Sequence, residues 1–239
     1  MKTKYLGKNN KNNKSGRDLL DCIERIKVDI KYGHDIWNVY DFMYLDQNKI
    51  PNLSLLEIVI PSNSKFIVES KSMKLYLNHF YNKSFKTKNE ISKKIQEDIE
   101  NKIKSKIKVR FLKSFVKEPN FIKLNNLQLK NTPIKKILKF NGFRSICPVT
   151  SQPDFANIYI YSDKSIKTSW LVKYLMSYAN HGGFHEQCIE TIFNDIKSNY
   201  EMKHLEVCGR FQRRGGIDIN PSRGTHIKKL FINFREFNQ

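Results

Sequence analysis

The chain has 239 residues, of which 39% are hydrophobic and 12% aromatic, so it has enough apolar side chains for one large or two small globular domains. No stretch approaches the roughly 18 consecutive apolar residues of a membrane-spanning helix, and the N-terminal residues contain no apolar run that would act as a secretion signal. These features argue against a membrane protein and predict a cytoplasmic one. The formal net charge of +20 leaves open a polyanionic partner such as RNA.

The first half of the chain predicts strands followed by a helix. The first 16 or so residues are rich in Lys and Asn and are expected to be mobile. Residues 26–30 (IKVDI) alternate as a half-buried strand does, an aromatic segment covers residues 33–45, and residues 53–60 predict a second strand that Pro61 closes.

Residues 87–103 predict a helix. Thr87 and Glu90 have the spacing of a capping box, and Ile91, Ile95 and Ile99 fall on one helical face. Residues 103–111 then alternate between apolar and basic side chains, which predicts a strand with one solvent-exposed face.

The lysine excess is densest between residues 101 and 140, where twelve basic residues accompany one acidic residue, Glu118. They stand among Asn, Ile and Phe rather than in an Arg-rich or Gly-rich tract. Because the same bias extends over the whole chain, a solvated basic surface is the simpler interpretation, and RNA binding remains the alternative.

The second half repeats the order of the first. It predicts a strand at residues 157–162, helical segments at 169–180 and 182–200, and a strand at 204–211. Residues 74–82 also align with residues 172–180 at a constant spacing of 98 residues, which pairs Tyr76 with Tyr174, Leu77 with Leu175, Phe80 with Tyr178 and Asn82 with Asn180. The sequence therefore predicts two tandem strand-strand-helix-helix-strand-strand modules, residues 1–120 and 121–239, in an α+β fold of antiparallel sheets with helices on one face.

The segment CPVTSQPD, residues 147–154, is the first candidate for chemistry. The other cysteines (Cys22, Cys188 and Cys208) are far from it and from one another, which predicts free thiols rather than disulfides. The two prolines favour a rigid loop that presents the side chain of Cys147. A carboxylate beside a thiol raises the pKa of the thiol, so Asp154 suits a proton donor to a substrate better than a base. A buried cysteine in a turn, with Asp154 capping backbone amides, explains the pattern equally well.

His185 and Glu186 are adjacent at a predicted helix start, after Gly182 and Gly183. Their side chains diverge by about 100°, so the imidazole would handle protons near the sulfur while the carboxylate accepts N–H donors of a heterocycle. A helix-capping pair is the alternative. A zinc site is a third interpretation, because His181, His185 and Cys188 have i, i+4, i+7 spacing, although the two glycines make a continuous helix doubtful.

Two further segments suit phosphate groups. Glu69 lies between a predicted strand and helix with Lys71 and Lys74 nearby, and residues 209–221 combine Arg210, Arg213 and Arg214 with two glycines. The chain contains neither a Rossmann fingerprint nor a P-loop, so a nucleotide would be held by side-chain cations. Solvated turns are the alternative at each segment.

Four motifs in this order, ESKSMKLYL, CPVTSQPD, HGGFHEQC and RRGGIDINP, resemble the NADPH-dependent 7-cyano-7-deazaguanine reductases, the nitrile reductases of queuosine biosynthesis. The resemblance is to the bimodular type and covers residues 33–223. It implies the tunnelling fold, a homodimer, no metal and no direct need for nucleic acid. Phe155 and Ala179 depart from the pattern, which has Trp and commonly a basic residue at these positions.

The resemblance also implies residue roles. Cys147 would attack the nitrile carbon of 7-cyano-7-deazaguanine to form a covalent thioimide, Asp154 would protonate the nitrogen, and His185 would assist proton transfer. Two NADPH per turnover would then give 7-aminomethyl-7-deazaguanine. The implied substrate-binding residues are Val68, Glu69, Ser70, His185 and Glu186, and the implied cofactor-binding residues are Ser70, Lys71, Arg214 and Gly215. A zinc-dependent pterin or purine hydrolase of the same fold and an RNA-binding module are the alternatives.

Overall fold

A computed structural model describes residues 16–26, 29–126, 128–227 and 229–239. The described chain forms two compact units: unit 1 holds the residues up to 26 together with 36–114 and 213–218, and unit 2 holds the rest. These units differ from the predicted modules in three short segments, 29–35, 115–120 and 213–218. The N-terminal segment that was expected to be mobile lies, up to residue 15, outside the described residues.

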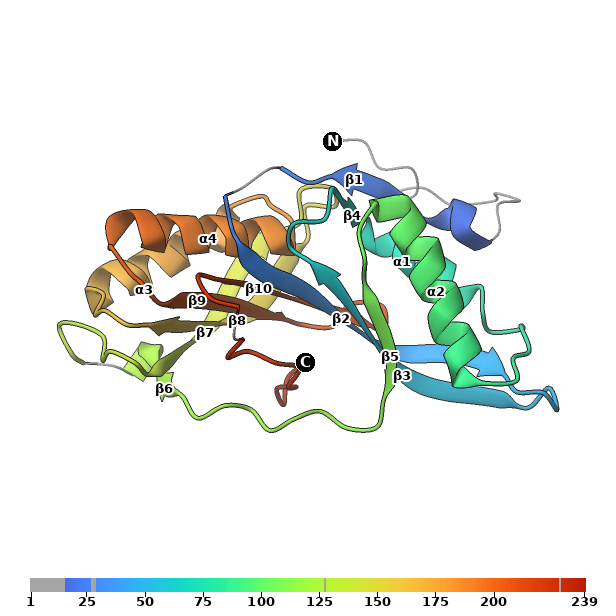
Figure 1. Ribbon diagram of the computed structural model, residues 1–239. Helices are drawn as coiled ribbons and strands as arrows, with labels where there is room; N and C mark the ends of the chain where they lie inside the picture. The colour runs from blue at the N-terminus through green and yellow to red at the C-terminus, as the bar shows by residue number, and fades with distance from the viewer. Residues whose placement is uncertain (1–15, 27–28, 127, 228) are drawn as a thin grey trace. The chain divides into compact units, whose positions relative to one another are not determined.

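Unit 1 packs two helices on one face of a small antiparallel sheet (Figure 1). Its strand order is β5-β3-β2, and β1 pairs with β4 in a separate two-stranded ribbon. The buried side chains of β3 (Leu56, Ile58 and Ile60) and those of α2 (Ile91, Ile95 and Ile99) belong to its core. The elements are η1 (Gly16–Leu19), β1 (Cys22–Glu24), β2 (Tyr32–Leu45), β3 (Pro51–Pro61), β4 (Phe66–Val68), α1 (Ser70–Asn78), α2 (Lys88–Ile103) and β5 (Lys108–Leu112), of which β2 begins within unit 2.

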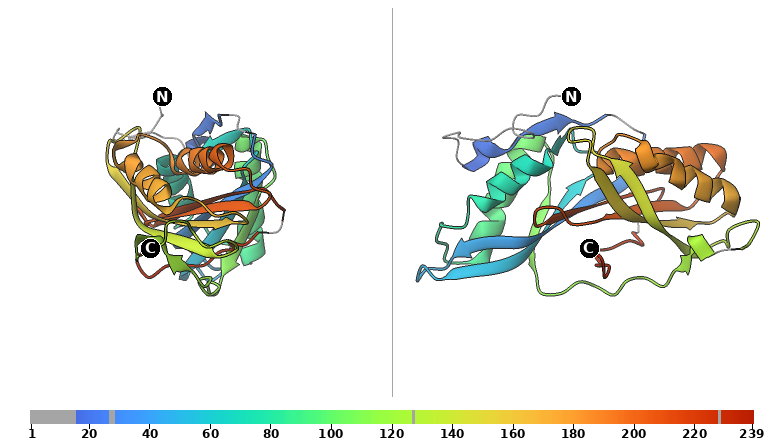
Figure 2. Two further views of the ribbon diagram at one scale, coloured as in Figure 1. Left: turned by 90° about the vertical axis from the view of Figure 1, so that its left-hand side faces the viewer. Right: turned by 180° about the vertical axis from the view of Figure 1, so that it is seen from behind.

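From β7 onward, unit 2 has the full predicted order of two strands, two helices and two strands, and the short β6 precedes them. Its strand order is β10-β9-β8-β7-β6, antiparallel except where the short β6 pairs parallel to β7. Figure 2 shows α3 and α4 together on one face of these strands. The elements are β6 (Ile122–Lys123), η2 (Leu124–Asn126), β7 (Ile137–Ile146), β8 (Pro153–Ser162), α3 (Thr168–Met176), η3 (Ser177–Asn180), α4 (His185–Asn199), β9 (Leu205–Phe211) and β10 (Ile217–Gly224), of which β10 begins within unit 1.

The internal repeat is confirmed in the helices. α1 and α3 are both nine residues long, and their first residues, Ser70 and Thr168, have the same 98-residue spacing as the aligned segments. Leu77 and Leu175, which the alignment pairs, are both buried. The repeat is incomplete after the helices, because β5 is the only strand there in the described part of unit 1, where two were predicted.

Two strand predictions were wrong in position. Lys27 and Val28 lie outside the described residues, and Ile26, Asp29 and Ile30 belong to no strand. The strand is instead β2, whose residues 34–39 are all buried, so the apolar-polar alternation that marks a half-buried strand is absent there.

The strand predicted at residues 103–111 is also shorter than expected. α2 continues through Ile103 and ends where Lys104 adopts a left-handed conformation with φ 56°, so that β5 begins only at Lys108. The carboxylate of Glu100 accepts a hydrogen bond from the N–H of Ile107 at 3.0 Å, which holds the connection between helix and strand.

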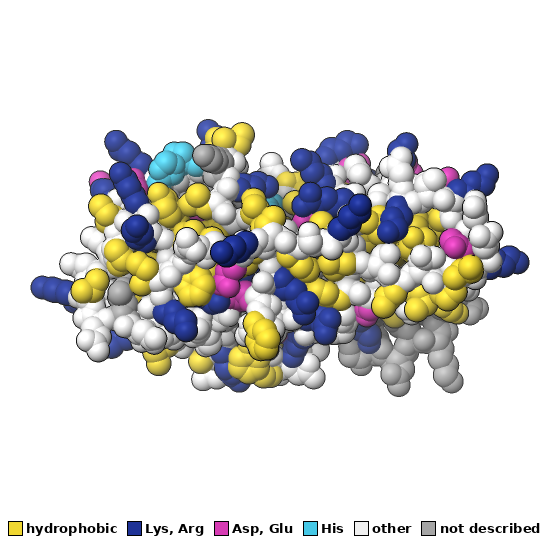
Figure 3. Space-filling model, turned by 90° about the horizontal axis from the view of Figure 1, so that it is seen from below, with side chains coloured by type: hydrophobic (Ala, Val, Ile, Leu, Met, Phe, Trp, Pro, Cys, Tyr) yellow, Lys and Arg dark blue, Asp and Glu magenta, His cyan; other side chains and the backbone are white. Residues whose placement is uncertain are grey.

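On the face shown in Figure 3, the described basic side chains do not gather in one place. Figure 3 shows Lys and Arg dispersed among hydrophobic and polar side chains over the face that it presents. This distribution agrees with a solvated basic surface and gives the RNA-binding alternative no localised patch on that face. Within the described residues, no helix is both long and apolar enough to cross a membrane.

Candidate functional site

Cys147 lies in a closed loop between β7 and β8. The last pair of the two strands is Ile146 with Pro153, and beyond it the N–H of Cys147 donates to the carbonyl of Gln152 at 2.8 Å. The N–H of Ser151, which has a positive φ of 56°, donates back to the carbonyl of Cys147 at 3.0 Å. These bonds fix the backbone on both sides of a half-buried thiol, as the two prolines predicted.

Asp154 and His185 face each other beside this loop. Asp154 is the second residue of β8 and is buried, and its Oδ2 lies 3.4 Å from Nε2 of His185. The ring of His185 stacks on Phe211 of β9, with centroids 4.0 Å apart and planes at 10°. The imidazole is thereby held by β9 on its face and directed at the carboxyl group on its edge.

α4 begins at His185, as predicted, and Glu186 is buried in its first turn. The N-cap residue is Phe184, whose N–H donates to Oε1 of Gln187 at 3.2 Å. Gln187 therefore supplies the capping contact that the alternative interpretation gave to His185 and Glu186. A carboxylate at this position is favoured by the positive end of the helix.

The proposed zinc ligands do not share a helical face. His181 follows η3 and lies outside α4, since Gly182 and Gly183 separate the two helices. Burial, reinforced by the charges of Asp154 and Glu186, raises the pKa of the Cys188 thiol to about 12. No group of three or more His, Cys, Asp or Glu side chains in the described ranges is arranged to hold a metal ion.

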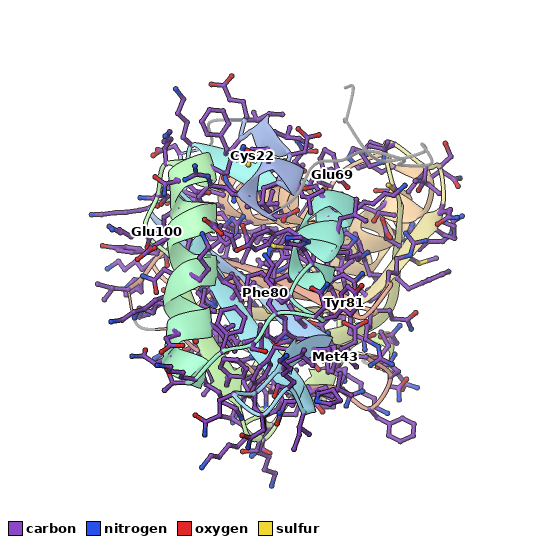
Figure 4. All side chains as sticks on the ribbon, turned by 90° about the vertical axis from the view of Figure 1, so that its right-hand side faces the viewer. Cys22, Met43, Glu69, Phe80, Tyr81 and Glu100 are labelled. Carbon is purple, nitrogen blue, oxygen red and sulfur yellow. The ribbon has the colours of Figure 1, made fainter. Side chains whose placement is uncertain are left out.

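Glu69 of unit 1 is the N-cap of α1, at the start of that helix in Figure 4. Its carboxylate is buried and accepts hydrogen bonds from the N–H groups of Lys71 and Ser72, both at 2.8 Å. Sequence reasoning missed this structural role, because Glu is not one of the residues that N-caps prefer. A carboxylate has about four acceptor positions, so the cap leaves capacity for another donor.

The glycines of RRGG form a two-residue turn before β10. The N–H of Arg214 donates to the carbonyl of Ile217 at 2.9 Å, and the reverse bond measures 3.3 Å. Gly215 and Gly216 have positive φ values of 55° and 78°, as a type I′ turn requires.

A cavity of about 250 Å³ lies beside this turn in unit 1. Its polar lining comes from Lys71, Lys74 and Asn78 of α1, Asp41 of β2, and Gly215, and its apolar lining comes from Val39, Phe42, Leu75, Leu77 and Ile217. The cavity brings together two predicted cofactor residues, Lys71 and Gly215, while Ser70 and Arg214 do not line it. Asp41 and Asn78 were not predicted as site residues, since none of the four motifs that gave the site residues contains them.

Comparison with known proteins places the chain in a family. A family model described as "Nitrile reductase, 7-cyano-7-deazaguanine-reductase N-term" matches residues 13–111, and one described as "QueF-like protein" matches residues 153–229. The NADPH-dependent 7-cyano-7-deazaguanine reductase of Buchnera aphidicola is 36% identical, over 81% of this chain and 82% of the relative. The chain belongs to the 7-cyano-7-deazaguanine reductases. Proteins of the same name from Coxiella burnetii (33% identical, 87% of this chain, 82% of the relative) and Desulfotalea psychrophila (36%, 85% and 82%) agree.

Membership in this reductase family identifies the chain as an oxidoreductase and confirms the resemblance and the α+β fold of two modules. Unit 2 gathers Cys147, Asp154, His185 and Glu186 around one end of its sheet. Unit 1 holds Val68, Glu69, Ser70 and Lys71 where β4 meets α1, together with Arg214 and Gly215. The roles that the resemblance gives to these residues stay predictions.

Arg144 lies beside Ala179, one of the two positions that depart from the reductase pattern. Ala179 stands where a basic residue is common, and the guanidinium of Arg144 on β7 donates to the carbonyl of Ala179. It also donates to Oδ1 of Asn180 at 3.3 Å. A cation from another element therefore lies beside the position where the pattern has one.

Proposed function

We propose that this protein reduces the nitrile of 7-cyano-7-deazaguanine to 7-aminomethyl-7-deazaguanine with NADPH, through a covalent thioimide. Family membership supports the overall reaction. The observation that carries the mechanism is the arrangement in unit 2, where a half-buried thiol in a hydrogen-bonded loop adjoins a buried Asp154 in contact with His185.

In the first step, Sγ of Cys147 bonds to the nitrile carbon, and one π-electron pair of the triple bond moves to the nitrogen. Asp154 gives that nitrogen a proton, and the proton released by the thiol returns to Asp154 through His185, so the adduct is a neutral thioimide. The 3.4 Å contact between His185 and Asp154 suits this return.

The reduction consumes two hydrides and two protons, because a nitrile becomes a primary amine. Bound NADPH supplies hydride, so two NADPH are oxidised for each substrate. After the first hydride has reached the carbon, the C–S bond breaks and Cys147 is regenerated. Asp154 and His185 supply the one proton that the nitrogen still needs and the proton that restores the thiol of Cys147.

Glu69 and Glu186 suit the guanine-like edge of the substrate, because each is a buried carboxylate at a helix start and carboxylates accept N–H donors. We assign Val68, Ser70 and His185 to the same substrate. Ser70, Lys71, Arg214 and Gly215 are assigned to NADPH. The cavity of unit 1 fits this assignment, since α1 contributes the ammonium groups of Lys71 and Lys74 to its lining, beside a glycine turn that lets a phosphate approach.

The test is spectroscopic. Mixing the purified protein with 7-cyano-7-deazaguanine in the absence of NADPH is expected to produce a thioimide absorbance, which Cys147→Ala abolishes. Cys22→Ala, which removes the other half-buried thiol, is the matched control and should retain the absorbance. Adding NADPH should oxidise two equivalents per substrate. An adduct that survives Cys147→Ala would refute the mechanism.

We also propose that the protein acts in the cytoplasm as a homodimer that needs no nucleic acid, which the family resemblance supports. Light scattering of the purified chain should give twice the mass of 28.3 kDa. Nuclease treatment should leave NADPH oxidation unchanged.

A further inference from the structure

Asp41 is an acidic residue in the cavity of unit 1 to which the sequence motifs gave no role. It lies on β2 between the half-buried Tyr40 and the buried Phe42, and its own side chain is exposed at the cavity. In the described part of the chain, its carboxylate makes no hydrogen bond or ion pair. The acceptor positions of this carboxylate are therefore open to a ligand.

The geometry of the Gly215–Gly216 turn sets the carboxylate beside a cation. A Cβ added at Gly216 would lie 1.9 Å from Oδ2 of Asp41, and one added at Gly215 would lie 3.4 Å from Cδ of Lys74 and 3.5 Å from its Nζ. The carboxylate and the lysine thus pack against neighbouring Cα atoms, which are about 3.8 Å apart in any trans chain. The N–H of Tyr40, next to Asp41, donates to the carbonyl of Gly216 at 2.9 Å and fixes the turn to β2.

This arrangement selects a ligand with two kinds of group. The ammonium groups of Lys71 and Lys74 favour an anion, whereas a carboxylate only accepts hydrogen bonds and repels a second anion. A neutral donor close to a phosphate satisfies both the carboxylate and the ammonium groups, and a sugar hydroxyl is such a donor. The volume of about 250 Å³ is below the roughly 300–1,000 Å³ of drug-sized ligand sites, so it suits a sugar phosphate rather than a whole dinucleotide.

We propose that Asp41 recognises a phosphorylated ribose of NADPH by accepting a hydrogen bond from a ribose hydroxyl, while Lys71 and Lys74 hold the phosphate. This assignment rests on the proposed function and adds a sugar contact to the phosphate contacts that the motifs imply. Asp41 then restricts the site to ribosyl phosphates, because an anion without a neighbouring hydroxyl gains nothing from the carboxylate and is repelled by it.

The test is calorimetric and needs no turnover. Adenosine 2′-monophosphate and nicotinamide mononucleotide represent the two phosphorylated riboses of the cofactor, and inorganic phosphate lacks the sugar. Asp41→Ala should weaken binding of one of the two nucleotides by about tenfold, the usual scale of a hydrogen bond to a charged group. The same variant should bind inorganic phosphate as tightly as the parent protein or more tightly, because a negative charge has been removed. The nucleotide that responds identifies which ribose occupies the cavity.

Two variants separate recognition from charge and from folding. Asp41→Asn keeps an acceptor oxygen and should lose only about two- to threefold in nucleotide binding. Glu97→Ala removes an exposed carboxylate of α2 that does not line the cavity, and should leave nucleotide binding unchanged. Unfolding midpoints of all three variants should match the parent protein, since the Asp41 side chain is exposed. If both nucleotides bind Asp41→Ala as tightly as they bind the parent, the proposal is overturned.

The result also separates this proposal from the proposed function. Thioimide formation does not use NADPH, so Asp41→Ala should form the adduct at the rate of the parent protein. A normal adduct combined with unchanged nucleotide binding would overturn the role of Asp41 and leave nitrile reduction standing. Absence of the adduct in the parent protein would overturn nitrile reduction, and calorimetry would still decide whether Asp41 binds a ribosyl phosphate.

Discussion

Substituting Glu69 would separate its structural contact from its proposed substrate contact. The Glu69 carboxylate is only 2% exposed and accepts two backbone N–H groups of α1 at 2.8 Å. In Glu69→Ala both donors lose their partner inside the protein. Loss of an N-cap costs about 0.5–2 kcal/mol, and a buried donor left unsatisfied costs about 1–3 kcal/mol. Because water can reach part of a helix start, we expect the free energy of unfolding to fall by about 2–3 kcal/mol.

Glu69→Asp distinguishes the two roles. Aspartate is a preferred N-cap, so this variant should retain most of the stability. Its carboxylate is one methylene shorter, so the contact with the substrate edge is lost and the KM for 7-cyano-7-deazaguanine should rise about tenfold or more, as for a lost hydrogen bond to a charged group. The KM for NADPH should stay the same.

Denaturant unfolding followed by the fluorescence of Trp37, which is buried in unit 1, measures the first effect, and steady-state kinetics measures the second. Thr87→Ala is the control, since Thr87 caps α2 through a bond of 3.2 Å from the N–H of Glu90 and has no proposed contact with substrate. It should lower stability by about 1 kcal/mol and leave both KM values unchanged. Glu69→Ala with the stability of the parent protein would refute the capping argument.

Three further predictions concern unit 2. Thiol labelling at pH 8, followed by mass spectrometry, should modify Cys147 and spare Cys188 and Cys208, because burial raises the pKa values of these two thiols to about 12. Labelling of Cys188 and Cys208 at a rate similar to that of Cys147 would contradict the prediction. Burial lowers the pKa of His34 from 6.5 to about 3, so His34 binds a proton more tightly in the unfolded chain than in the folded protein. The stability of the fold is therefore retained above pH 6.5 and lost as the pH falls towards 3. Between pH 7 and pH 5 the free energy of unfolding should fall by about 2 kcal/mol, and denaturation curves at the two pH values should show no such fall in His34→Leu. Equal pH dependence in the two proteins would exclude His34 as its source. Arg223→Met should lower the free energy of unfolding by about 3–5 kcal/mol, because the buried guanidinium binds the carboxylates of Asp35 and Glu190, each at 2.7 Å, and both would lose their counter-charge. A loss under about 1 kcal/mol would show that these carboxylates are solvated.

Local patterns in the sequence predicted several elements well. The isoleucines at 91, 95 and 99 are fully buried on one face of α2, and Thr87 caps that helix as its spacing to Glu90 predicted. The hairpin loop at Cys147 follows from its prolines, and α1 and α3 confirm the 98-residue repeat. Each of these features depends on residues that are neighbours along the chain, so the sequence contains the whole pattern.

Other features depend on what packs against a segment. β2 was missed because residues 34–39 are all buried although three of them, His34, Asp35 and Asn38, are polar. Its pattern is a continuous run of buried residues, which periodicity does not distinguish from an irregular aromatic segment. The end of α2 at Lys104 was missed for a related reason, since a left-handed lysine carries no sequence signal of the kind that glycine gives.

The candidate site divides in the same way. Sequence alone supplied the residues that we propose for nitrile chemistry, a loop cysteine with a nearby carboxyl group and a histidine at a helix start, because motifs of consecutive residues carry them. Only the tertiary structure decided that His185 faces Asp154, that Glu69 caps α1, and that Asp41 joins Lys71 and Gly215 in one cavity. The physical reason is that a cavity is formed by side chains from distant segments, and their approach is set by the packing of strands and helices rather than by any local pattern.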